Sequence, residues 1–226
     1  MHKPLRIHQI VLLAVSYFVI YQTALPALFS SVIYPEFGMQ AYLLSMELAE
    51  AFMIVLTVLL CFGWLMQNTE RFRARQGENI FTAIRCVAIM FLISAALGAF
   101  VFALFGMSEA ENQVTNDMIE QLDRPAFIFS AAVFAPFMEE MLFRGCVFQP
   151  LRNRFGFAAG AAVSALLFGG VHLLATVYAG NWINLLYIFE YGSCGFMLCW
   201  AMEKTGSVLT SMLAHAMYNL IIILFL

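Results

Sequence analysis

The sequence predicts an all-α fold: a polytopic bundle of about seven transmembrane helices, within a range of six to eight, with a cytoplasmic N-terminus. The composition is the first indication, because 63% of the 226 residues are hydrophobic and only 11% are charged. Soluble domains are about 25% charged, and a soluble chain of this size could not hide so much apolar surface. Most of the surrounding solvent must therefore be lipid.

The second indication is the length of the apolar stretches, since a helix needs about 20 apolar residues to cross the hydrocarbon core. Seven stretches qualify: residues 7–28, 41–66, 80–107, 125–148, 157–178, 182–202 and 207–226. Glu47 and Glu50 indicate that the second stretch begins in the interface. The first stretch is longer than the apolar region of a signal peptide, and Pro26 interrupts its only cleavage-like site, so we expect an uncleaved span.

The charges of the connecting loops predict the orientation. Eight cations fall on one side of a seven-span arrangement: Lys3, Arg6, Arg71, Arg73, Arg75, Arg152, Arg154 and Lys204. The other side carries the acidic loop 108–124, with Glu109, Glu111, Asp117, Glu120, Asp123 and the single cation Arg124. Because cytoplasmic loops are enriched in Lys and Arg, the N-terminus is expected in the cytoplasm and the acidic loop outside.

No long linker or internal repeat divides the chain, so residues 1–226 are expected to form one membrane-embedded domain. We expect an integral, multi-pass protein of a bacterial cell membrane, whose partners are the lipid bilayer and no nucleic acid, since no long run of Lys and Arg is present. The five cysteines are Cys61, Cys86, Cys146, Cys194 and Cys199. They lie in or beside apolar stretches, which predicts small buried hydrophobes and no disulfide framework or zinc site.

Ionisable side chains inside spans point to the function, because each costs about 2.5–3.5 kcal/mol at a helix centre. The candidate set comprises Glu139, Glu140, Arg144, His172, His215 and Asn219. Residues four apart share a helix face, so Glu140 can pair with Arg144 while Glu139, turned by about 100°, points elsewhere. Pro136 has no N–H, so a kink and a freed carbonyl are expected just before the pair.

Three further residues lie near this set. Gly169 and Gly170 precede His172 and would let another helix approach closely. Glu190 has two interpretations: a substrate-binding carboxylate, or a structural partner of Arg85 or a hydroxyl, which we favour.

Two chemistries fit the candidate set. A carboxylate and an imidazole can deprotonate water, while a second imidazole and a carboxamide can donate to an oxyanion, which together would hydrolyse an amide. Alternatively, Glu139, His172 and His215 could bind a divalent metal such as zinc with an open water position. The sequence leaves both open.

Three ordered motifs resemble a known family. Glu-Glu-x-x-x-Arg begins at Glu139, Phe-x-x-x-His ends at His172, and His-x-x-x-Asn begins at His215. Together they resemble the CPBP family of CAAX proteases and bacteriocin-processing enzymes, also called the Abi family, over residues 125–226.

This resemblance implies an intramembrane endopeptidase in which Glu139, assisted by His172, activates water. His215 and Asn219 would form the oxyanion hole, and Glu140 with Arg144 the supporting ion pair. It favours a mechanism without metal or other cofactor, although the family has also been labelled metalloprotease. The substrate would be a membrane-associated peptide or protein, lipid-modified in the CAAX branch, in maturation of bacteriocins or pheromones or in self-immunity.

Two other functions are kept as alternatives: a non-catalytic membrane scaffold that binds another membrane protein, and a transporter that uses the buried carboxylates. The depth of His172 tests the shared site. A fifth span beginning at residue 157 places His172 about 22 Å along its helix, deeper than Glu139, unless that span is tilted or begins near Gly160. A separation of Glu139 and His172 above about 10 Å would exclude a shared site.

Overall fold

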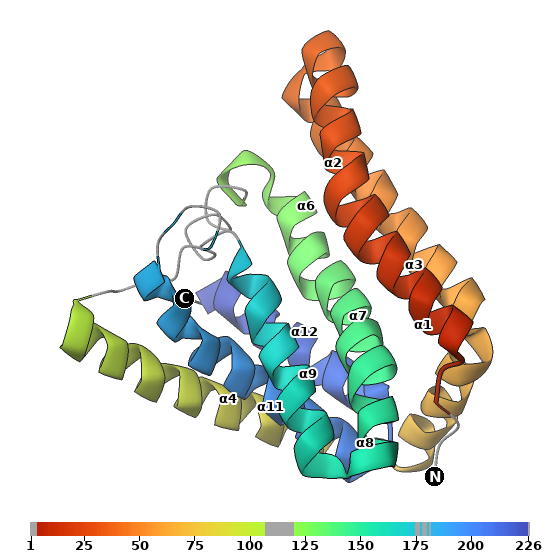
Figure 1. The fold of residues 1–226 in the computed structure, drawn as a ribbon, viewed down its shortest axis with the longest axis vertical. Helices are drawn as coiled ribbons and strands as arrows, with labels where there is room; N and C mark the ends of the chain where they lie inside the picture. The colour runs from red at the N-terminus through yellow and green to blue at the C-terminus, as the bar shows by residue number, and fades with distance from the viewer. Residues whose placement is uncertain (1–3, 107–119, 175–176, 178–179, 181, 226) are drawn as a thin grey trace.

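The computed structural model describes residues 4–106, 120–174, 177, 180 and 182–225, and every regular element in this part of the chain is helical (Figure 1). The elements are α1 (Ile7–Ala14), η1 (Val15–Ala24), α2 (Leu25–Leu28), η2 (Phe29–Ile33), α3 (Tyr34–Ala74), α4 (Gln76–Phe105), α6 (Arg124–Phe129), η3 (Ser130–Phe134), α7 (Ala135–Glu139), η4 (Glu140–Phe148), α8 (Gln149–Phe155), α9 (Phe157–His172), η5 (Trp182–Tyr187), α11 (Ile188–Thr205) and α12 (Val208–Phe225). Elements η1 to η4 are π-helical and η5 is a 3-10 helix. Consecutive elements join into longer rods. Because all the described elements are helices, the predicted all-helical class is confirmed.

Five of these rods are long and apolar enough to cross a membrane, as a multi-pass protein requires: Ile7–Ala74, Gln76–Phe105, Arg124–Phe155, Trp182–Thr205 and Val208–Phe225. The first has 68 residues and bends back on itself at Gly38, whose φ of 81° is open to glycine but strained for other residues. In Figure 1 its first limb rises to the tip of the molecule and its second limb returns. The first two predicted spans are therefore this hairpin, and the predicted end at Leu28 is wrong, because the helix continues beyond it.

The fourth and fifth predicted spans also change length. The rod Arg124–Phe155 continues past residue 148 through α8, whereas α9 has only 16 residues. It ends at His172 because Leu173 leaves the helical conformation, with φ −103° and ψ 5°. The expected full span over 157–178 is thus too long, and Tyr178 lies outside the described residues. Met107, Glu109, Glu111 and Asp117 also lie outside them.

These lengths resolve the mismatch in depth between Glu139 and His172. Glu139 lies sixteen residues before Phe155, and His172 lies fifteen residues after Phe157, where the chain turns from α8 into α9. The two residues therefore lie at nearly the same distance from the turn that joins α8 to α9, one on each side of it. The expected mismatch was wrong because it ended the fourth span at residue 148.

Helix α9 packs against α11 almost backbone to backbone. A Cβ atom on Gly169 would lie 3.0 Å from the Gly192 nitrogen, and one on Gly195 would lie 3.1 Å from the Ala165 Cα. Glycine at these positions therefore lets the helices approach to a distance that side chains would prevent. Gly170 has open space at its Cβ position, so only the first glycine of the predicted pair has this role.

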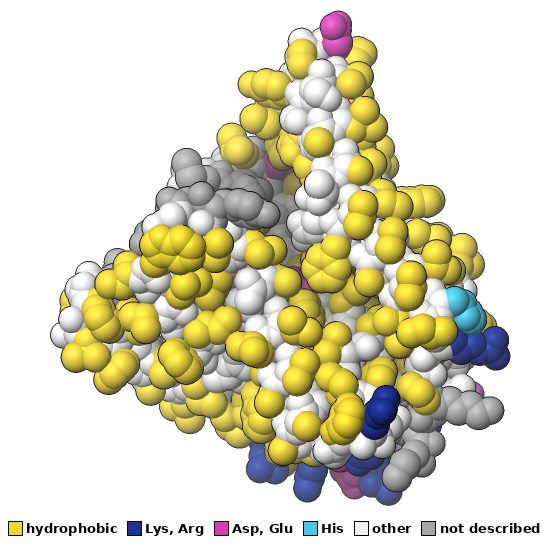
Figure 2. Space-filling view, in the orientation of Figure 1, with side chains coloured by type: hydrophobic (Ala, Val, Ile, Leu, Met, Phe, Trp, Pro, Cys, Tyr) yellow, Lys and Arg dark blue, Asp and Glu magenta, His cyan; other side chains and the backbone are white. Residues whose placement is uncertain are grey.

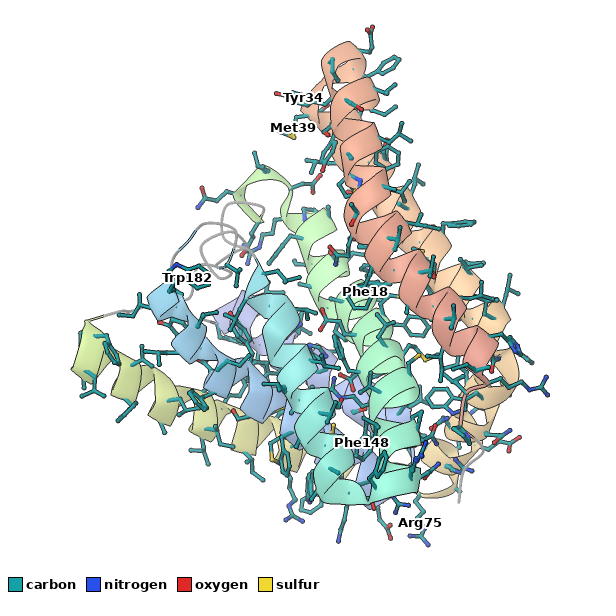
Figure 3. The ribbon with its side chains drawn as sticks, viewed as in Figure 1. Phe18, Tyr34, Met39, Arg75, Phe148 and Trp182 are labelled. Carbon is teal, nitrogen blue, oxygen red and sulfur yellow. The ribbon has the colours of Figure 1, made fainter. Side chains whose placement is uncertain are left out.

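The two ends of the molecule differ in charge. Dark-blue Lys and Arg side chains gather at the lower end of the face in Figure 2, most of which is yellow and hydrophobic. Arg75 lies at this end, and Tyr34 and Met39 lie at the opposite tip (Figure 3). A two-pronged ion pair joins α8 to α11, with Nη2 of Arg152 2.7 Å from Oε1 of Glu203. The Lys and Arg side chains visible on this face thus gather at one end, as the predicted separation of basic and acidic loops requires.

The cysteines are free, and the predicted burial is confirmed for most of them. Four are buried and Cys146 is partly buried. The start of α12 is buried as well, where the Asn68 side-chain oxygen accepts a hydrogen bond of 3.0 Å from the Val208 nitrogen. This cap satisfies a helix N–H that lies away from water.

Candidate active site

A fully buried ion pair, Glu140 with Arg144, adjoins the candidate site. Nε of Arg144 is 3.0 Å from Oε2 of Glu140, and both side chains have no exposed surface. Nη2 of Arg144 donates to the Gly195 carbonyl at 3.1 Å, and its guanidinium lies 4.7 Å from the centre of the Phe168 ring. These contacts compensate a charge that would be costly to bury alone. They also tie the Glu139 helix to α9 and α11.

The same glutamate orients a histidine from α12. Nδ1 of His215 lies 3.1 Å from Oε1 of Glu140. An ionised carboxylate only accepts hydrogen bonds, so we assign the proton to Nδ1. Nε2 of a neutral His215 then presents a lone pair, 3.9 Å from Oε2 of Glu139.

His172 is held in the same way by its own helix. Its Nδ1 lies 2.8 Å from the Phe168 carbonyl oxygen, which is an acceptor, and its Nε2 lies 3.9 Å from Oε2 of Glu139. The Tyr191 ring stacks on the imidazole with 4.8 Å between centroids and 19° between planes. Sequence reasoning missed Tyr191, although it is next to Glu190 in the sequence.

Glu139 lies where these two histidines converge. Its side chain is 12% exposed, and Oε2 has no hydrogen-bond partner among the described residues. A separation of 3.9 Å is too long for a direct hydrogen bond, which spans about 2.7–3.2 Å, but a bridging water would reach both groups. These three acceptors face one another, and a water molecule bound between them would donate to two of them.

Asn219 makes a contact that the sequence did not predict. Its Nδ2 donates to the Ala131 carbonyl at 2.8 Å. In the π-helix η3, each carbonyl normally accepts a hydrogen bond from the N–H of the residue five positions later. The Ser130 carbonyl, for example, accepts from the Ala135 N–H. For Ala131 that residue is Pro136, which has no N–H. Asn219 therefore replaces the missing donor, and its second amide hydrogen is left for other partners.

The described residues contain no group of three or more His, Cys, Asp and Glu side chains arranged to hold a metal. Two ligands of a tetrahedral zinc with bonds of about 2.1 Å would be about 3.4 Å apart. Glu139 is 3.9 Å from both His172 and His215, so these three residues do not have zinc-ligand spacing.

Glu190 is partly buried on α11 and forms no ion pair with Arg85 among the described residues. The Arg85 guanidinium lies 5.9 Å from the centre of the Trp200 ring instead. The Ser94 hydroxyl lies within interaction range of the Glu190 carboxylate, while its hydrogen bonds are with Tyr218 and Cys194. Both interpretations of Glu190 therefore stay predictions, except that Arg85 is not its partner.

A second buried carboxylate, Glu50, lies outside the motifs. It is only 5% exposed, and the hydroxyls of Tyr21 and Ser130 both donate to its Oε1 at 2.8 Å. Glu50 lies inside the protein, because Tyr21 of η1 and Ser130 of η3 pack against it, and α3 begins before residue 41. The expectation that the second stretch begins in the interface stays a prediction. Its place inside an apolar stretch was the available signal.

The fold and site define a class: a polytopic helical membrane protein with a buried glutamate between two histidines. Residues 121–221 match the family described as type II CAAX prenyl endopeptidase Rce1-like. All six predicted site residues fall in this region, so the resemblance to the CPBP family is confirmed.

One curated relative supports the same family. The chain is 25% identical over 150 residues to "Putative membrane peptidase YdiL" of Bacillus subtilis (strain 168). The match covers 66% of this chain and 57% of the relative's length. No solved structure matches the chain.

Proposed function

We propose that this protein is an intramembrane endopeptidase that hydrolyses a peptide bond in a membrane-associated peptide or protein. The observation that carries the proposal is the position of Glu139, whose Oε2 lies 3.9 Å from Nε2 of both His172 and His215 without a hydrogen-bond donor among the described residues. A water molecule bound there would give one proton to the carboxylate and be oriented by an imidazole.

The proposed reaction starts when Glu139 accepts a proton from this water while His172 accepts a hydrogen bond from it. The water oxygen bonds to the carbonyl carbon of the scissile peptide, and the carbonyl electron pair moves to the oxygen. When the tetrahedral intermediate collapses, the C–N bond breaks and the proton held by Glu139 passes to the leaving nitrogen. No atom other than those of water is added.

The oxyanion in this scheme needs donors. Nε2 of His215 can donate to the oxyanion only in the form of the ring that carries a proton on both nitrogens; Oε2 of Glu139 lies 3.9 Å from Nε2 and Oε1 of Glu140 lies 3.1 Å from Nδ1. Asn219 has one amide hydrogen beyond the one given to Ala131. These two residues are therefore our candidates for the oxyanion hole.

The family and the setting support the proposed substrate class. A groove of about 410 Å³ between the segment η1–η2 and α3 is lined mainly by apolar side chains, among them Ile20, Phe29, Leu48 and Phe52. Such a groove supports a substrate that carries a lipid chain, as CAAX-type processing would involve. Bacteriocin or pheromone maturation and self-immunity remain within the same proposal, as does a location in a bacterial cell membrane with a cytoplasmic N-terminus.

The test compares the membrane and secreted peptides of a strain that expresses the wild-type protein with those of a Glu139→Gln strain. The substitution keeps the shape of the side chain but removes the base, so an uncleaved precursor should accumulate and its fragments should disappear. Glu36→Gln, at the exposed tip of the hairpin, is the matched control and should process normally. Normal processing by Glu139→Gln would overturn the proposal, and partner regulation that survives this substitution would favour the scaffold.

A further inference from the structure

We propose that Glu50 is a specificity-determining residue, which binds a cationic group of the substrate three to four residues from the scissile bond. This inference rests on the proposed peptidase function. Sequence motifs do not include Glu50, and it lies on α3, in the half of the chain outside the family match.

The first argument is the burial of Glu50 in an apolar setting. The side chain is 5% exposed and belongs to a helix long and apolar enough to span the membrane. Ionisable residues in such helices are costly, and they pair with one another or serve a pathway or ligand. Glu50 must therefore have a compensating partner or a function.

The second argument is the uneven use of its two oxygens. Tyr21 and Ser130 both donate to Oε1 at 2.8 Å, which joins the first hairpin to the helix that carries Glu139. Oε2 is enclosed and has no hydrogen-bond partner among the described residues. The contacts that hold the hairpin use one oxygen, and the other is left for a donor that the described chain does not supply.

The third argument is distance from Glu139. Thr57 lies two helical turns after Glu50 and donates to the sulfur of Met138, the neighbour of Glu139, at 3.4 Å. The level of Glu139 along α3 is therefore about 10 Å from Glu50. Ser130, which contacts Glu50, lies nine residues before Glu139 on the rod Arg124–Phe155. This spacing corresponds to about 13 Å along the helix axis. An extended peptide advances about 3.3 Å per residue and would cover this interval in three to four residues.

The interval between the two carboxylates holds the polar side chain of Tyr17 beside buried apolar side chains such as Phe134 and Met138. The Tyr17 side chain is 6% exposed and lies within electrostatic range of both Glu139 and Glu50. Its hydroxyl accepts a hydrogen bond of 3.1 Å from Gln22. A peptide that follows this path meets the Tyr17 hydroxyl as an acceptor among apolar side chains, and an ammonium or guanidinium at its end would form an ion pair with Glu50.

The experiment uses the full chain in lipid nanodiscs and internally quenched peptides built on the sequence that the peptide comparison identifies. Lys, Gln or Glu is placed in turn three and four residues from the scissile bond, on each side, and kcat/KM is measured. We expect wild type to prefer Lys over Gln at one of these positions by about tenfold or more, as for one buried ion pair. Glu50→Gln should bring this ratio close to one, and Glu50→Lys should turn the preference toward Glu.

Two controls separate specificity from structure. Glu36→Gln should keep the wild-type preference for Lys. Tyr21→Phe and Ser130→Ala remove donors to Glu50 but keep its charge, so they should lower thermal stability while preserving the preference. Equal kcat/KM for Lys, Gln and Glu peptides with the wild-type protein would overturn the role of Glu50. In that case, a Glu139→Gln variant inactive on every peptide would leave the proposed peptidase intact.

Discussion

Nδ1 of His215 lies 3.1 Å from Oε1 of Glu140, whose other oxygen binds Arg144 at 3.0 Å. This chain of contacts runs from α11, through the helix that carries both glutamates, to α12. It turns the free Nε2 of His215 toward Glu139. The glutamate that forms the supporting ion pair therefore also selects the tautomer of a histidine in the site.

Glu140→Gln tests this double role. The amide can donate to Nδ1 and so trap the opposite tautomer, and it leaves the Arg144 charge buried without a counterion. We expect kcat/KM to fall by about 100-fold or more and stability to fall by about 3–5 kcal/mol, measured by peptide cleavage and thermal unfolding. Glu203→Gln, in the half-buried pair with Arg152, is the control and should change both little.

Asn219→Ala tests the replacement of the missing proline donor. Loss of the hydrogen bond to Ala131 should cost about 1–3 kcal/mol, because a partly buried carbonyl is left unsatisfied. Pro136→Ala would restore a backbone N–H for that carbonyl, so the double variant should recover stability in a thermal unfolding assay. Additive losses in the double variant would refute this pairing.

The same pair of variants separates two roles of Asn219. If its second amide hydrogen serves the oxyanion, the double variant should regain stability but remain at least about tenfold below wild type in kcat/KM. Pro136→Ala alone is the control for effects of the proline on activity. Full recovery of activity in the double variant would confine Asn219 to the structural role.

Gly169→Ala tests the close packing of α9 and α11. A methyl group would meet the Gly192 backbone at 3.0 Å, and backbone atoms cannot move aside, so a loss of about 1–3 kcal/mol is expected. The shift should also displace His172, three residues later, and lower cleavage. Gly170→Ala is the matched control, because its Cβ would enter open space, and it should behave as wild type in both measurements.

Metal removal tests the proposed chemistry directly. Glu139, His172 and His215 lack zinc-ligand spacing, so prolonged dialysis against a strong chelator should leave peptide cleavage unchanged. Metal analysis of the dialysed protein verifies that the treatment worked. Cleavage that is lost with the metal and restored by added zinc would assign these residues to a metal site and contradict the proposed role of Glu139.

Local sequence features determined the class of this protein. Apolar stretches of helical length predicted a membrane bundle, because a helix that crosses the hydrocarbon core must be long enough and apolar along its length. The spacing of Glu140 and Arg144 predicted their ion pair, since four residues return a helix to the same face. Three motifs on separate helices predicted the family, which the match over residues 121–221 supports. The roles that they imply for the site residues stay predictions.

Only the tertiary structure decided which groups face one another across helices. The contact of His215 with Glu140, the use of Asn219 to satisfy Ala131 and the enclosure of Glu50 by Tyr21 and Ser130 each join residues at least 29 positions apart. The hydropathy of a stretch reports its lipid exposure but not the rotation or depth of its helix. The rotation and the depth of a helix depend on its contacts with other helices, such as the one at Gly169. They also depend on where the chain turns, and the turn after α8 brings Glu139 and His172 to one level.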